Sequence, residues 1–172
     1  DIYLKSGNSR GGAGGDILLS VGEGAGSVDG GAIFISAGVT GADRSSGGNV
    51  DVAGGDGVST IGGVGGDVNI RGGRGAGGVG GSLFFSSGPG ELTSSGSIVV
   101  NTPNAGLKGV SGGIRVTTGT TSRGSSGNIE FSSGYANGGS GGNITFMVGS
   151  GTRNNGGSIN ILGGETRASK RR

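Results

Sequence analysis

The strongest constraint in this sequence is an internal repeat that covers its whole length. Eleven repeats of 15 to 18 residues fill all 172 positions, and each of the first ten ends in glycine. The repeats begin at residues 1, 16, 32, 49, 67, 82, 97, 113, 128, 143 and 158. Short repeats cannot bury an apolar face alone, so their fold depends on contacts between repeats. We therefore expect one repeat domain, 1–172, that is a segment or protomer of a longer array.

Apolar residues occupy positions 2 and 4 of every repeat, whereas position 3 is variable. Position 2 is held by Ile2, Ile17, Ile33, Val50, Val68, Leu83, Ile98, Ile114, Ile129, Ile144 and Ile159. Position 4 is held by Leu4, Leu19, Ile35, Val52, Ile70, Phe85, Val100, Val116, Phe131, Phe146 and Ile161. This alternation is typical of a half-buried strand. The glycine pairs and the two-residue period argue against helix.

Turn-forming residues flank each predicted strand. Position 7 is glycine in ten repeats and Pro103 in the seventh, and position 1 is Asp, Asn or Ser in nine of the eleven. Glycine tolerates positive φ, and short polar side chains cap nearby backbone amides. The pattern predicts a bend that starts at position 7 and a second limb of small residues.

Together these features predict an all-β fold, a β-solenoid of about eleven short glycine-rich coils with one repeat per coil. Positions 2 and 4 of successive coils would then form two inward apolar ladders. Neighbouring coils along each ladder would lie about 4.8 Å apart. A second geometry places two repeats in each coil, and an antiparallel meander fits the uniform repeat direction less well. Polar caps are missing from both terminal repeats, so we expect a longer array or end-to-end stacking of copies.

Composition limits the chemistry that the chain can perform. It contains 49 glycines but no Cys, His or Trp, and its net charge is only +2. Thiolate and imidazole ligands and Cys–His or Ser–His nucleophiles are therefore absent from the sequence. The carboxylates that share position 1, Asp1, Asp16 and Asp67, are interpreted as turn caps rather than calcium ligands. We expect no catalytic residues, no metal site, no cofactor and no enzymatic activity.

Outward apolar residues at position 3 are the candidate interface. They are Tyr3, Leu18, Phe34, Phe84 and Val99. If positions 2 and 4 face inward, these five face outward, and contiguous exposed apolar surface usually marks an interaction site. We expect lateral packing against another copy of the chain at these residues.

Three further features bear on processing and partners. Asn143 begins the one N-glycosylation sequon, Asn-Ile-Thr, and is a candidate glycan acceptor. Lys170, Arg171 and Arg172 form a candidate processing site. The single Arg71-Gly-Gly-Arg74 stretch is weak support for nucleic-acid binding, and we expect none. No apolar run is long enough to span a membrane.

The sequence pattern GG[DNS]-apolar-x-apolar-x-x-G, repeated about every 15 residues, resembles that of the glycine- and serine-rich tandem-repeat proteins of algae and protists. Many of those proteins are secreted, so the resemblance implies an extracellular or cell-surface location and a structural role. The sequence thus predicts a non-enzymatic structural protein, a self-assembling protomer of an extracellular filament, appendage or matrix. The alternative is an ice-binding protein or a glycan-contacting adhesin stalk.

Overall fold

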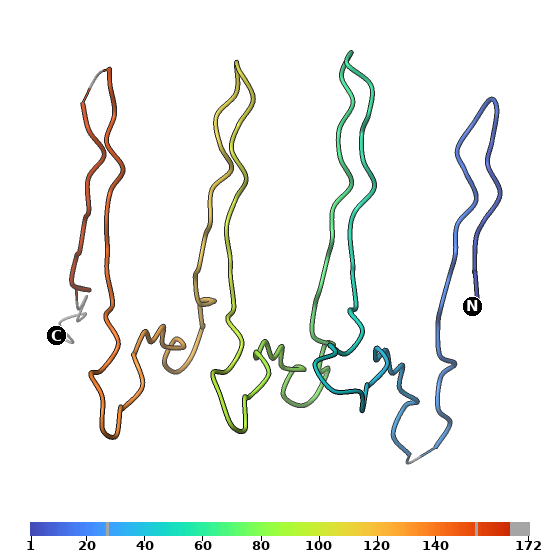
Figure 1. Ribbon diagram of the computed structural model, residues 1–172, viewed down its shortest axis with the longest axis horizontal. Helices are drawn as coiled ribbons and strands as arrows, with labels where there is room; N and C mark the ends of the chain where they lie inside the picture. Colours follow the sequence, from blue (N-terminus) through green and yellow to red (C-terminus); the bar gives the residue numbers. More distant parts are fainter. Residues whose placement is uncertain (27, 154, 166–172) are drawn as a thin grey trace, which may run out of the picture. The chain divides into compact units, whose positions relative to one another are not determined.

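The computed structural model describes residues 1–26, 28–153 and 155–165, and none of these residues lies in a helix or a strand. Over these residues the chain is drawn as a trace that repeatedly turns back on itself, without sheet arrows or helical ribbons (Figure 1). It divides into two compact halves, Asp1–Ser86 and Ser87–Arg172. The described part of the protein is therefore largely coil.

The predicted β-solenoid is wrong, both with one repeat per coil and with two. A solenoid requires continuous backbone ladders between successive coils, and no described residue belongs to such a ladder. The alternation of apolar and polar residues specifies which side chains share a face. It does not supply a hydrogen-bonding partner for the backbone, and a strand exists only when that partner is present.

One bend or turn nevertheless recurs in each of the first ten repeats, between positions 10 and 14 of the repeat. These bends lie at 10–12, 26 and 28, 42–44, 60–62, 76–78, 91–93, 107–108, 122–124, 137–139 and 152–153. Positive φ is found at such bends, at Gly26, Gly62, Gly124, Gly138 and Arg44. The sequence predicts that a position-7 glycine with positive φ starts the bend. That prediction is wrong, because the bends and their positive-φ residues lie later in the repeat.

The position-7 glycine instead closes the repeat by accepting a hydrogen bond. In five repeats the last glycine donates its backbone N–H to the position-7 carbonyl at 2.8 to 3.3 Å. The donor–acceptor pairs are Gly15–Gly7, Gly48–Gly38, Gly66–Gly55, Gly81–Gly73 and Gly96–Gly88. In the seventh repeat, where Pro103 takes position 7, the hydroxyl of Thr102 donates to the carbonyl of Gly112 at 3.1 Å.

The same closure brings the last glycine against the residue at position 6. A Cβ on Gly48 would lie 3.3 Å from Cβ of Ala37, and a Cβ on Gly157 would lie 2.8 Å from Cγ1 of Val148. Five described residues are half-buried, and the rest are exposed. Four of the five are position-6 residues, Ser6, Ala37, Gly54 and Thr102, and the fifth is Ala136. The tightest packing is therefore a small contact inside each repeat, and no residue of the described part is fully buried.

Replacing a closing glycine should open its repeat. In Gly81→Ala, the new Cβ would lie 3.0 Å from the backbone nitrogen of Gly73, so the limbs must move apart and weaken the 2.9 Å bond between them. Loss of about 1 kcal/mol of net hydrogen-bond free energy corresponds to roughly fivefold faster exchange of the residue 81 amide. Hydrogen exchange followed by NMR on the dilute protein measures this change.

Gly77→Ala is the matched control, since a Cβ there meets nothing within 4 Å and Gly77 has no positive φ. It adds the same methyl group to the bend of the same repeat and should leave the residue 81 amide unchanged. Equal exchange rates at residue 81 in both variants would show that the closing contact does not hold the two limbs together.

Candidate functional site

In several repeats the exposed fraction alternates along positions 2 to 4, which indicates two different faces. In the third repeat Phe34 is 92% exposed, whereas its neighbours Ile33 and Ile35 are 48% and 74% exposed. Side chains at positions 1 and 3 share the other face, because Tyr3 donates to Asp1 at 3.3 Å and Asn160 donates to Ser158 at 3.2 Å. We call the face of positions 1 and 3 the odd face, and the face of positions 2, 4 and 6 the even face.

The even face is partly covered by its own repeat. The returning limb brings the last glycine against position 6, which is why Val148 keeps only 41% of its surface exposed. Position 2 is about half exposed in the second to eleventh repeats, and position 4 is more exposed than that. The two apolar positions thus reduce their contact with water, although the described residues build no core around them.

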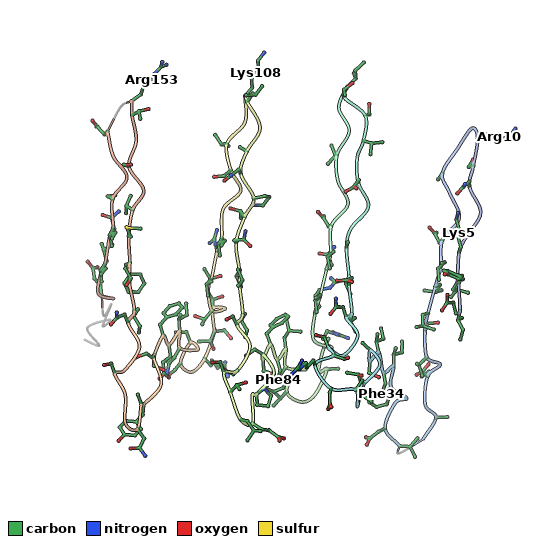
Figure 2. All side chains as sticks on the ribbon, viewed as in Figure 1. Lys5, Arg10, Phe34, Phe84, Lys108 and Arg153 are labelled. Carbon is green, nitrogen blue, oxygen red and sulfur yellow. The ribbon has the colours of Figure 1, made fainter. Side chains whose placement is uncertain are left out.

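All five predicted interface residues on the odd face are exposed. Tyr3, Leu18, Phe34 and Phe84 lie in the N-terminal half, and Val99 lies in the C-terminal half. Figure 2 labels the side chains of Phe34 and Phe84 on their limbs. Their predicted contiguity followed from stacked strands, which the described residues lack. The structure therefore shows five exposed apolar side chains, and lateral packing against another copy at these residues stays a prediction.

Hydroxyl groups in the bends are the polar contacts that sequence reasoning missed. Ser9 Oγ accepts the backbone N–H groups of Gly12 at 3.0 Å and Gly11 at 3.4 Å. Thr40 and Ser59 accept from residues two positions later at 3.2 Å. The capping role assigned to position 1 is thus carried out here by Ser and Thr of the second limb. The signal was available, because Ser and Thr favour such local turns.

The remaining predicted sites are placed as follows. Asn143 is exposed, so its side chain is accessible. Lys170, Arg171 and Arg172 lie outside the described residues. Basic residues also mark several loop tips, where Arg10, Lys108 and Arg153 point away from the chain (Figure 2). In the described part, the structure forms neither a pocket nor a cluster of residues that could hold a metal ion. Within the same residues, no helix has the length and apolar character to cross a bilayer.

Substitution of Phe34 by Asp tests the odd face. Phe34 is almost fully exposed, so Phe34→Asp should leave the single chain unchanged. If this side chain is buried between copies, its loss removes about 2 kcal/mol per contact and raises the critical concentration of assembly about thirtyfold. Sedimentation of a concentration series measures the critical concentration.

Asn69→Asp is the matched control, because Asn69 also stands at position 3 and the substitution adds the same charge without removing apolar surface. It should change assembly far less than Phe34→Asp does. Identical critical concentrations for Phe34→Asp and the unaltered protein would exclude Phe34 from the interface.

The comparisons with known proteins give no information on the function of this chain. No family model, no curated protein and no solved structure matches this chain.

Proposed function

We propose that the chain is a non-enzymatic structural protein that assembles with other copies of itself into an extracellular filament, appendage or matrix. The observation that carries this proposal is the recurrent exposure of large apolar side chains. In each of the eleven repeats, the residues at positions 2 and 4 are at least 48% exposed. The contacts between copies take the place of the core that the described residues do not form.

Exposed apolar surface on this scale favours association. Burying a single Ile, Leu or Phe side chain contributes roughly 1.5–3 kcal/mol, and the repeat offers two such side chains about every 15 residues. A copy that meets another copy finds the same spacing of apolar positions, so many weak contacts form together.

The internal closure of each repeat suits such an assembly. In five repeats a glycine-to-glycine hydrogen bond holds the second limb back, and Ser or Thr hydroxyls before three of the bends accept backbone N–H groups. Each repeat is thereby a small loop that presents Ile, Val, Leu or Phe outward. Because glycine loses more conformational entropy on ordering than any other residue, these loops gain order chiefly when neighbours pack on them.

An extracellular location fits the same proposal. The repeat pattern resembles that of secreted glycine- and serine-rich proteins. The exposed Asn143 provides an acceptor for N-glycosylation on such a route.

Electron microscopy and sedimentation of the purified protein across a concentration series test this function. We expect large particles above a critical concentration and dispersed chains below it, because contacts between copies obey mass action. The particles should dissolve on dilution and form again on concentration. A chain that stays monomeric at every concentration while it binds ice or a glycan would contradict self-assembly and favour the binding module.

A further inference from the structure

Charge along the chain is divided into an acidic segment and a basic segment. Residues 11–70, the acidic segment, contain seven acidic side chains and one basic one, a net charge of −6. Residues 71–153, the basic segment, contain two acidic and six basic side chains, a net charge of +4. The overall net charge of +2 is therefore a sum over segments of opposite charge within one chain.

The charged side chains of both segments are accessible to a partner. All of those that the structure describes are exposed. The acidic segment places Glu23, Asp29, Asp43 and Asp56 in the second limbs of its repeats. The basic segment places Lys108 and Arg153 at loop tips that point away from the chain (Figure 2). Charged and apolar side chains are thus exposed along the same described residues.

We propose that copies of this chain pair in a staggered order, so that the acidic segment of one copy lies on the basic segment of the next. This inference rests on the proposed self-assembly and adds a direction to it. In-register pairing of parallel copies would place like charges together, at −6 against −6 and +4 against +4, which is unfavourable. A shift by about half the chain removes that repulsion and leaves one segment of each end copy unpaired.

The repeat permits this stagger. Both segments keep apolar residues at positions 2 and 4 of each repeat. A shift by whole repeats therefore still sets apolar positions of one copy against apolar positions of the other, while it sets acidic residues against basic ones. Apolar burial then supplies the free energy of association, and charge selects the register. Because each staggered contact leaves a free segment, addition of copies continues rather than closing after two, as open head-to-tail interfaces do.

The test reverses the charge of each segment separately and then together in the full chain. The acidic-segment variant carries Glu23→Lys, Asp29→Lys, Asp43→Lys and Asp56→Lys. The basic-segment variant carries Lys108→Glu, Arg115→Glu, Arg123→Glu and Arg153→Glu. Either variant alone makes both segments of one sign. The combined variant restores opposite signs in reversed order, with 11–70 at +2 and 71–153 at −4.

We expect each single-segment variant to raise the critical concentration at least tenfold at low salt, and the combined variant to recover most of the loss. The effect should shrink at about 1 M salt, where the Debye length is about 3 Å. A charge-conserving control, Arg115→Lys with Arg123→Lys and Arg153→Lys, should assemble as the unaltered protein does. Light scattering and sedimentation give the critical concentrations.

The outcomes separate this inference from the proposed function. If the unaltered protein assembles and all variants assemble equally well, charge does not set the register and the stagger is wrong, while self-assembly stands. Growth that stops at a dimer, or salt-sensitive compaction of single chains at every concentration, would also overturn the stagger. If the unaltered protein never assembles at any salt concentration, the proposed function itself fails.

Discussion

The contact on which the structure depends is the closure of each repeat by its last glycine. In five repeats the backbone N–H of that glycine donates to the position-7 carbonyl, and in eight repeats a Cβ added to that glycine would meet the side chain at position 6. Four of the five half-buried residues stand at position 6, beside this contact. The contact also explains why position 6 is small or β-branched, since a longer side chain would push the returning limb away.

A single closing bond per repeat is too little to build a sheet. Strands are stabilised by successive hydrogen bonds and by cross-strand side-chain pairs, whereas five of the repeats here pair their limbs by one such closing backbone bond. Glycine makes that close approach possible and raises the entropy cost of ordering the rest of the loop. The result is a chain with regular local geometry and, in the described residues, no buried core.

Exposed apolar side chains and the opposite charges of the acidic and basic segments have different roles in the proposed assembly. Apolar surface is non-directional and recurs in every repeat, so it supplies attraction in any register. The acidic and basic segments differ along the chain and can therefore distinguish one register from another. Ile33 and Phe34 illustrate the first effect, and Asp43 and Lys108 illustrate the second.

The sequence by itself determined the repeat boundaries, the alternation of faces within each repeat and the exposure of Phe34 at position 3. These properties are local, because they follow from side-chain period and glycine placement. Only the tertiary structure decided that the position-7 glycine accepts a hydrogen bond rather than forming the bend, and that Ser9 rather than Asp1 caps a turn. It also replaced the predicted solenoid with closed loops. The reason is that alternation specifies a face, whereas a sheet needs a hydrogen-bonding partner for its backbone, and in five repeats the closing glycine finds its partner within the same repeat.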